Sequence, residues 1–298
     1  MYHIPVLLNE SIDGLNIHPN GIYVDVTYGG GGHSKEILAS LTKGQLYAFD
    51  QDQDSAIHKI NDPRFHLFHE NFRFIKNFLQ FHGVHLVDGI LADLGISSHQ
   101  IDDPGRGFST RLEGILDLRM NQGQKVKGQD IINDYSLDHL KKIFKLYGEI
   151  RNAGALGNLI ITERAIEPIL STSRLKEIAT KCAPKGKENK YLAQVFQAIR
   201  IEVNEEIEAL KEMLLQASEI LNPGGRLVVI SYHSIEDRIV KNFIKSGNFE
   251  GVIKKDFYGH PQIPLKAINR KPIVPNQEEL LRNSRSRSAK LRIAEKIK

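Results

Sequence analysis

The fold is decided by residues 23–34, which read Tyr-Val-Asp-Val-Thr-Tyr-Gly-Gly-Gly-Gly-His-Ser. An apolar, β-branched run ends in four glycines, and a helical pattern follows at Ser34. Glycine tolerates the positive φ of a tight turn and lets a ligand approach bare backbone. The first N–H groups of a helix also lack partners within the helix. The stretch therefore predicts the strand, turn and helix that hold the cofactor in an α/β nucleotide-binding sheet.

Strand and helix patterns alternate around this stretch. After a leading helix at residues 6–12, the expected strands are residues 21–26, 44–50, 65–69 and 86–93, and the expected helices are 34–41, 54–60 and 72–81. Alternation of this kind favours a parallel, doubly wound sheet with helices on both faces. The fold class that we expect is therefore α/β.

The alternation stops between Pro104 and Val203, where no convincing strand occurs. A glycine-rich polar loop, 102–128, is followed by helical patterns at 136–146, 156–169, 173–180 and 191–203. The α/β pattern then resumes with a helix at 204–221, a turn at 222–225, a strand at 226–231, a helix at 235–243 and a final strand around 291–293. The proline-rich segment 259–276 is expected to be a surface loop. We therefore expect a core built from residues 1–103 and 204–298, with an all-helical domain inserted at 104–203.

Composition narrows the class of protein. The chain has 298 residues, enough for one large domain or two ordinary ones, and 41% of them are hydrophobic, too many for a disordered protein. The net charge of +4 is too small to indicate a nucleic-acid partner without a clustered distribution. Cys182 is the only cysteine, which excludes an internal disulfide and any zinc site of two or more thiolates. His82 and His85 have no evident third ligand, so we expect no metal site.

The start of the chain lacks the charged and apolar regions of a secretory signal, and no window reaches the length of a membrane span. We therefore expect a soluble, cytoplasmic protein with no membrane partner. The sequence does not fix the oligomeric state, and a homodimer is compatible with it.

The glycine turn by itself is also compatible with a simple tight turn. Two acids favour the interpretation that it binds a cofactor. Asp50 ends the second expected strand, 17 residues beyond His33, where an acid can accept hydrogen bonds from ribose hydroxyls. Asp93 ends the strand at 86–93. Because the carboxyl ends of neighbouring parallel strands border one crevice, we expect both acids to lie beside the turn.

The turn occurs in dehydrogenases, flavoproteins and methyltransferases, and its details favour the last. Ser34 stands where the dinucleotide fingerprint G-x-G-x-x-G has its last glycine. S-adenosylmethionine has no phosphates and needs backbone contacts, an acid for its ribose and an apolar slot for adenine. Phe72, near the start of its helix, is a candidate wall of that slot, the alternative being an ordinary core phenylalanine.

Several segments together resemble one family closely. Residues 231–238 read Ser-Tyr-His-Ser-Ile-Glu-Asp-Arg, and residues 93–98, Asp-Leu-Gly-Ile-Ser-Ser, are followed by 102–109, Asp-Asp-Pro-Gly-Arg-Gly-Phe-Ser. In these and other segments across nearly the whole chain, the sequence resembles the bacterial 16S ribosomal RNA (cytosine-N4)-methyltransferases. It departs from the family pattern at His99, where proline is usual, and at Ile150, where glutamate is usual.

The resemblance implies a Rossmann-like class I methyltransferase core with an inserted helical domain that recognises RNA. It implies S-adenosylmethionine as cofactor and, as substrate, a cytidine in the decoding centre of 16S ribosomal RNA within the small ribosomal subunit. The family's cofactor contacts carry over to Gly31, Gly32, His33, Asp50, Phe72, Asp93 and Gln100.

The chemistry of the acceptor suggests further candidates. The lone pair of the cytosine exocyclic amine is delocalised into the ring, and a carboxylate accepting its N–H bonds would localise that pair, which is the catalytic role expected of Asp93. His233 is the candidate proton acceptor or RNA contact, with helix capping as the alternative. The candidate substrate contacts are Arg106, Phe108, Asp117, Arg119, Tyr232, Arg285 and Arg287. For Asp117 and Arg119, a local ion pair that shapes the loop is the favoured interpretation.

Basic residues gather in two places that fit phosphate neutralisation, the alternative being solvated charged surface. Residues 281–298 contain Arg282, Arg285, Arg287, Lys290, Arg292, Lys296 and Lys298 against the single acid Glu295, and the insertion contains Lys181, Lys185, Lys187 and Lys190. Three other functions stay open: an amino-methyltransferase on another nucleic acid, a non-catalytic ribosome assembly factor, and a nicotinamide-dependent oxidoreductase.

Overall fold

The computed structural model describes residues 5–297 and divides the chain into two compact units. The first unit joins the residues up to Gly95 with those from Ile207 onward, and the second is Ile96–Glu206. The insertion predicted from the sequence, 104–203, is shorter than this second unit. The second unit begins earlier because Ile96 already packs against its hydrophobic core.

In the described part of the first unit, seven strands form one sheet in the order β3-β2-β1-β4-β5-β7-β6. Their bounds are β1 (Ile22–Asp25), β2 (Gln45–Phe49), β3 (Phe65–Phe68), β4 (Val87–Asp93), β5 (Leu221–Ser231), β6 (Leu265–Ala267) and β7 (Lys290–Lys296). β1 to β5 are parallel, whereas β7 is antiparallel to both β5 and β6. The expected mostly parallel α/β sheet is confirmed. Its strand order reverses between β1 and β4, the position at which such sheets bind ligands.

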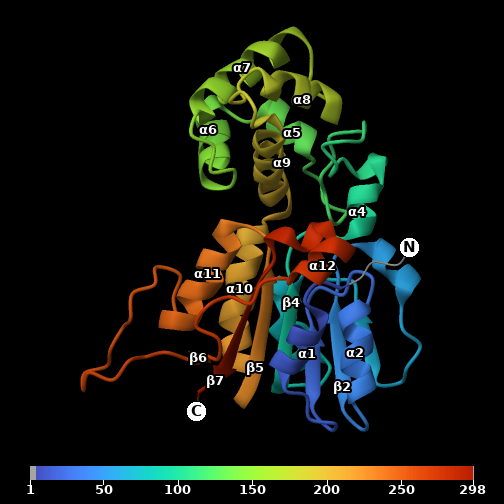
Figure 1. The fold of residues 1–298 in the computed structure, drawn as a ribbon, viewed down its shortest axis with the longest axis vertical. Coiled ribbons are helices and arrows are strands. Elements are labelled where there is room, and N and C mark those ends of the chain that lie inside the picture. The colour runs from blue at the N-terminus through green and yellow to red at the C-terminus, as the bar shows by residue number, and fades with distance from the viewer. Residues whose placement is uncertain (1–4, 298) are drawn as a thin grey trace. The chain divides into compact units, whose positions relative to one another are not determined.

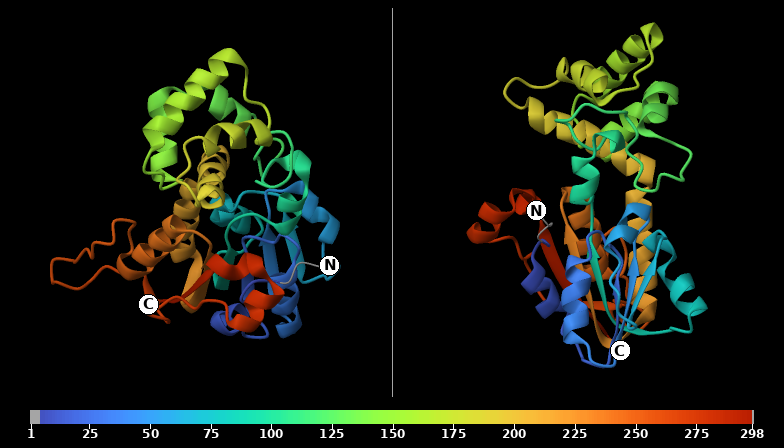
Figure 2. Two further views of the ribbon diagram at one scale, coloured as in Figure 1. Left: turned by 45° about the horizontal axis from the view of Figure 1, so that its top comes forward. Right: turned by 90° about the vertical axis from the view of Figure 1, so that its right-hand side faces the viewer.

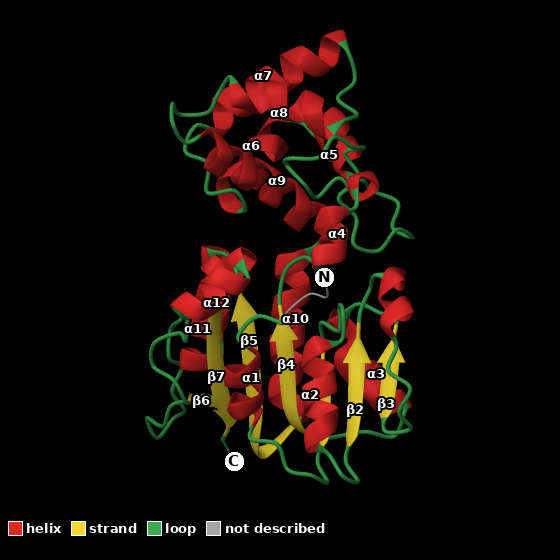
Figure 3. Cartoon of the chain, turned by 45° about the vertical axis from the view of Figure 1, so that its right-hand side comes forward, coloured by secondary structure: helices red, strands yellow, loops and turns green. Residues whose placement is uncertain are grey.

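Helices cover both faces of this sheet (Figures 1 and 3). They are α1 (Leu8–Leu15), α2 (Gly32–Ser40), α3 (Ile75–Phe81), α10 (Glu206–Ile220) and α11 (Ser234–Ser246). The short helix α12 (Gln277–Arg282) lies near the upper end of the sheet in these views. α1 and α2 contact each other on one face. On the other face, Arg73 donates two hydrogen bonds of 2.8 Å to Glu212 of α10. Burial of both faces explains why the strands read as continuous apolar runs.

The second unit is helical and has a hydrophobic core of its own (Figure 2). Its helices are α4 (Ser98–Asp102), α5 (Gly128–Asp134), α6 (Leu137–Leu146), α7 (Ala153–Ile166), α8 (Thr172–Thr180) and α9 (Glu188–Asn204). α9, the longest of these, contacts α5, α6 and α8. Among the described residues of this unit, strand pairing is limited to one isolated bridge, between Ile115 and Ser171. The inserted helical architecture is therefore as expected.

Several local predictions need correction. The segment 259–276, expected to be a loop throughout, contains the short strand β6. This strand forms through the pairing of its three residues with β7. Residues 54–60, expected to be a helix, form the 3₁₀ helix η1 (Gln53–His58) instead. The expected turn at 222–225 lies inside β5 as an irregularity, where the pairing with β4 jumps by several residues. The left-handed φ of 81° at Gly224 permits that irregularity.

No helix in the described range 5–297 is both long enough and apolar enough to cross a membrane.

Candidate active site

The glycine turn after β1 is held by backbone hydrogen bonds. The N–H of Tyr28 donates to the carbonyl of Phe49 at 2.9 Å, and the N–H of Gly31 donates to the carbonyl of Tyr28 at 2.8 Å. Gly31 has a φ of 73°, and a Cβ there would lie 2.7 Å from the Tyr28 hydroxyl oxygen. A Cβ on Gly30 would meet no atom within 4 Å. The turn therefore requires glycine at 31 for its own fold, whereas Gly30 presents bare backbone to open space.

Asp25, at the end of β1, is buried beneath this turn and is 1% exposed. Its Oδ2 accepts a hydrogen bond of 2.7 Å from the Ser34 hydroxyl, and its Oδ1 accepts one of 3.1 Å from the Thr27 N–H. Burial raises the pKa of Asp25 to about 6 against these stabilising hydrogen bonds. No role was predicted for Asp25 from the sequence, although its place at a strand end before the glycines is a usable signal.

Asp50 follows β2 and connects that strand to the glycine turn. Its Oδ2 accepts a hydrogen bond of 2.7 Å from the Gly29 N–H, and its Oδ1 accepts one of 2.9 Å from the Asp52 N–H. Burial raises the pKa of Asp50 to about 7. Because each carboxylate oxygen can accept a further hydrogen bond, Asp50 retains capacity for a hydroxyl-bearing ligand.

Asp93 is the last residue of β4, and its backbone and side chain contact three other residues. Its N–H donates to the Thr27 hydroxyl at 2.6 Å, and its Oδ1 accepts a hydrogen bond of 2.8 Å from the Tyr232 hydroxyl. Its Oδ2 lies 3.9 Å from Nδ1 of His33. Burial raises the pKa of Asp93 to about 7, and the hydrogen bond from Tyr232 acts in the opposite direction. The sequence predicted the position of Asp93 but not this tyrosine partner.

The three carboxyl groups have no Lys or Arg partner among the described residues. The basic group closest to Asp93 in the site is His33, whose Nδ1 lies 3.9 Å from Oδ2 of Asp93. The charge of Asp25 raises the pKa of both other acids. A buried carboxylate without a partner is costly, so the site favours either protons or a cationic ligand.

His33 lies in the first turn of α2 and is 6% exposed. Its Nε2 donates a hydrogen bond of 3.1 Å to the carbonyl of Val6, which leaves Nδ1 directed at Asp93. His33 therefore connects the segment before α1 to the acid at the end of β4. Gly32, at the start of the same helix, is pressed against Pro5, because a Cβ on it would meet the proline ring.

His233 caps α11, which is the structural alternative that the sequence analysis left open. Its Nδ1 accepts a hydrogen bond of 3.4 Å from the Glu236 N–H, and Nε2 lies 3.0 Å from Oε1 of the same glutamate. Oε2 of Glu236 accepts from the N–H of Tyr232 at 2.9 Å. Glu236, which the sequence analysis did not single out, thereby orients the loop that carries the Tyr232 hydroxyl to Asp93.

The geometry does not assign a cofactor-binding role to two of the expected contacts, Phe72 and Gln100. Phe72 is half-buried at the start of the 3₁₀ helix η2 (Phe72–Phe74), after β3. Gln100 belongs to the second unit and is 5% exposed. Its Oε1 accepts from the Ser97 N–H at 3.1 Å, completing the capping box of α4. The roles of both residues in cofactor binding stay predictions.

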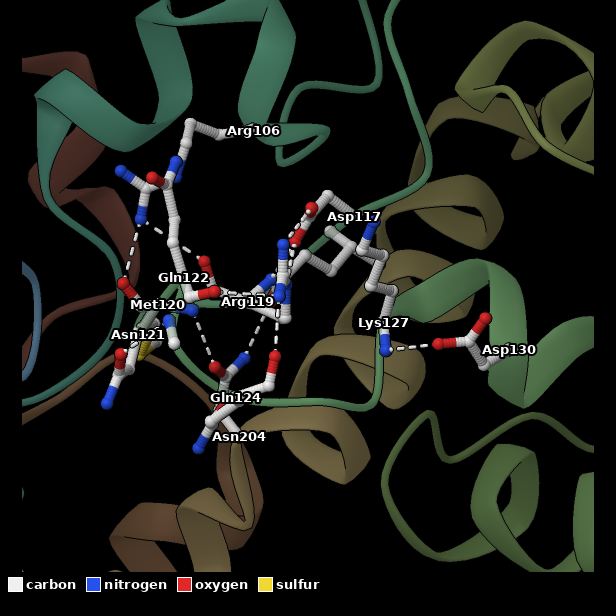
Figure 4. Close-up of polar contacts among 12 residues, drawn as sticks. Arg106, Asp117, Arg119, Met120, Asn121, Gln122, Gln124, Lys127, Asp130 and Asn204 are labelled. Carbon is white, nitrogen blue, oxygen red and sulfur yellow. Dashed lines mark hydrogen bonds and ion pairs between the residues drawn. The ribbon is translucent and has the colours of Figure 1, made fainter.

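In the second unit, the candidate substrate residues form a polar network that shapes a loop (Figure 4). Arg119 pairs with Asp117 through bonds of 2.7 and 2.8 Å, as favoured from the sequence. Arg106 is only 2% exposed and donates to the carbonyls of Arg119 and Met120 at 3.2 and 2.8 Å. Phe108 is buried in the core of the unit. In this structure these four side chains support the loop, and Phe108 offers no exposed ring to a base.

In the basic tail, residues 281–298, fewer cationic side chains are available at the surface than the sequence indicates. Arg292 is 8% exposed and donates a hydrogen bond of 2.6 Å to Asp237, and Lys296 donates to the carbonyl of Ser218. Arg285 and Arg287 are exposed on the 3₁₀ helix η4 (Ser284–Ser288). In the insertion, Lys181 is paired with Glu163 at 2.8 Å. Part of the basic charge therefore stabilises the fold and is not available to a partner.

A mostly parallel sheet with a glycine turn after β1 and acids at the carboxyl ends of adjacent strands defines a Rossmann-like, nucleoside-binding α/β protein. Comparison with known proteins narrows this class. The profile of the MraW methylase family matches residues 1–297, and the chain belongs to that family.

Curated relatives match the chain almost from end to end. "Ribosomal RNA small subunit methyltransferase H" of Christiangramia forsetii is 56% identical over 297 residues, covering 99% of this chain and 98% of the relative. The proteins of the same name from Flavobacterium johnsoniae and Cytophaga hutchinsonii are 57% and 56% identical, with 99% of this chain covered and 98% and 100% of the relatives. The protein is therefore a methylase.

Proposed function

We propose that the protein transfers the methyl group of S-adenosylmethionine to the exocyclic N4 amine of a cytidine in the decoding centre of 16S ribosomal RNA, within the small ribosomal subunit. Membership of the methylase family and the name of the full-length relatives support this reaction and substrate. The resemblance of the sequence motifs supports the cytosine-N4 acceptor.

The observation that carries the proposal is the set of three carboxyl groups without a Lys or Arg partner among the described residues, beside an open glycine turn. A sulfonium cofactor brings a positive charge, two ribose hydroxyls and no phosphate. Asp25 and its neighbours supply the negative charge, and Asp50 has spare acceptor capacity for the hydroxyls. The space beside Gly30 admits a ligand against the backbone. The residues present therefore fit this cofactor.

The residues that would hold the cofactor lie mostly in the first unit. Gly31, Gly32 and His33 form the turn and the start of α2, Asp50 would bind the ribose, and Phe72 would border the adenine. When bound, S-adenosylmethionine supplies a methyl group activated by its sulfonium charge. The protein then needs to orient the acceptor nitrogen and exclude water, and orientation alone contributes about 7–11 kcal/mol in favourable intramolecular reactions.

Asp93 is the residue that orients and activates the amine in this proposal. A carboxylate that accepts N–H bonds from the exocyclic amine directs the nitrogen lone pair toward the methyl group. Hydrogen bonds from Tyr232 to its side chain and from its own N–H to Thr27 fix the carboxylate in one position. Because the pKa of Asp93 is raised to about 7, it can also take up the proton that the amine releases.

The proposal is tested by incubating the protein with labelled S-adenosylmethionine and small subunits that lack the modification, and then mapping the methylated nucleotide. We expect a single N4-methylated cytidine in the decoding centre. Asp93→Ala serves as the inactive control, with its fold checked by circular dichroism. Methylation of a different nucleic acid would show that the proposed 16S substrate is wrong. Tight binding of subunits without any methyl transfer would indicate a non-catalytic assembly factor.

A further inference from the structure

The second unit contains a cavity of about 560 Å³ whose lining shares no residue with the network around Arg106. Its walls come from the loop before α7, from the loop before α9 and from the first two turns of α9. The volume falls within the range of about 300–1,000 Å³ that is typical of small-ligand sites. The cavity shares no lining residue with the candidate cofactor site.

The cavity is lined by three cations that have no partner. Arg151, Lys187 and Lys190 are exposed, and their side chains form no hydrogen bond or ion pair with any described residue. The one acid among the described lining residues is Glu149. Lys181, nearby in sequence, is by contrast neutralised by Glu163. The cavity therefore carries an excess of positive charge that the protein itself does not compensate.

Helical spacing concentrates these groups on one side of α9. Lys187, Lys190, Tyr191 and Gln194 all line the cavity and follow the i, i+3, i+4, i+7 spacing of a single helix face. The opposite side of α9 is anchored in the core, where Leu192 and Phe196 are buried. The cationic face is thus carried on a rigid element, which reduces the entropy lost on binding.

The remaining walls are held by hydrogen bonds. The hydroxyl of Tyr191 donates to Oδ1 of Asn152 at 3.1 Å, and Nδ2 of Asn152 donates to the carbonyl of Cys182 at 2.8 Å. This chain of contacts joins the start of α7 to the segment before α9. Both helices begin at the cavity without a side-chain cap, so their N-terminal N–H groups add to the preference for an anion that the cations establish.

We infer that this cavity binds a phosphodiester segment of the RNA substrate, with Arg151, Lys187 and Lys190 on the phosphates. The inference rests on the proposed function, which makes the substrate an RNA. The volume accommodates a nucleotide, and clustered unpaired cations are the usual phosphate ligands of RNA-binding surfaces. The site is distinct from the carboxylate cluster of the first unit and adds affinity without taking part in methyl transfer.

The test compares two double variants that lose the same charge in the same unit. Lys187→Ala/Lys190→Ala alters the cavity, and Lys142→Ala/Lys176→Ala removes two exposed lysines outside it. Binding of a fluorescent single-stranded RNA is followed by anisotropy across a salt series. At about −0.7 in log–log slope per phosphate contact, each lost contact weakens binding about fivefold at ~0.1 M salt. We expect the cavity variant to bind ~25-fold more weakly, with a slope shallower by about 1.4, and the control variant to match wild type.

The affinity for S-adenosylhomocysteine, measured by calorimetry, should be unchanged in both variants. Equal RNA affinities of the two variants, or equal salt slopes, would overturn the inference. So would competition by an acidic peptide of the same charge as effectively as by RNA. If wild type methylates the small subunit and the cavity variant does so with unchanged KM, the cavity inference fails alone. If no RNA is methylated but the cavity variant still loses RNA binding, the proposed function fails and the cavity inference stands.

Discussion

Replacing Asp93 by asparagine should stabilise the protein while it abolishes methyl transfer. The carboxyl group has a pKa of about 7 in the folded protein and of about 3.9 in an unfolded chain. The folded state therefore holds its proton more tightly. The stability from that proton is fully present below the unfolded pKa, declines as the pH rises, and is lost above about pH 7. Asparagine is neutral at every pH and keeps an oxygen that accepts from the Tyr232 hydroxyl.

The size of the effect follows from the pKa difference. At 1.36 kcal/mol per pKa unit, the ionised carboxyl costs the fold at most ~1.5 kcal/mol at pH 5 and ~4 kcal/mol at pH 8. Solvent relaxation around the charge reduces both figures. For a chain of this length, 1 kcal/mol corresponds to about 2 °C in Tm. We expect Asp93→Asn to raise Tm by at least ~4 °C at pH 8 and by less than half of that at pH 5.

The assay is thermal unfolding by circular dichroism at both pH values, in the absence of cofactor. Asp13→Asn, which neutralises an exposed acid on α1 of the same unit, is the matched control and should leave Tm nearly unchanged at both pH values. A gain that is equal at pH 5 and pH 8, or a loss of stability at pH 8, would refute the reasoning. In the same preparation, methylation should fall by at least ~100-fold, in line with a lost general base.

The remaining predictions concern the ligands. Raising the pH from 5.5 to 8 ionises the three acids, so the affinity for the cationic S-adenosylmethionine should increase about tenfold (~1.4 kcal/mol) relative to the neutral S-adenosylhomocysteine, as measured by calorimetry; a constant ratio would contradict a charge role for the cluster. Gly30→Ala should keep the wild-type Tm, because its Cβ meets no protein atom, and should weaken cofactor binding at least tenfold, whereas unchanged affinity would remove the cofactor from that space. Charge reversal of Arg285 and Arg287 should weaken RNA binding, measured by anisotropy, at least tenfold and leave cofactor affinity unchanged; RNA affinity that does not vary with salt would exclude them as phosphate contacts.

The sequence predicted the parts of the site that follow from chain topology. Parallel strands end at the same edge of a sheet, so an acid directly after β2 and an acid at the end of β4 had to approach the turn after β1. That reasoning located Asp50 and Asp93. The same periodic patterns gave the helices of the insertion, because amphipathic spacing is a local property of the sequence.

Contacts between distant segments were not predictable in this way. The hydroxyl of Tyr232 donates to Asp93, and Glu236 accepts from the N–H of the same tyrosine; no sequence pattern encodes that geometry. Charge counting likewise assigned Arg292 to an RNA patch, since a sequence does not show that Asp237 lies opposite it. Short elements such as β6 form through pairing with a distant strand, here β7. Local propensity alone does not predict them.

The order of strands has a consequence for how the chain folds. β4 and β5 are neighbours in the sheet, but the whole helical unit, Ile96–Glu206, is interposed between them in sequence. The helical unit is continuous and can collapse on contacts close in sequence, whereas the sheet unit has to wait for a long-range pairing. Until β5 arrives, the apolar edge of β4 is unsatisfied and available to other chains. Aggregation during synthesis should therefore begin at β4, and a chaperone that shields this edge would raise the yield of folded enzyme.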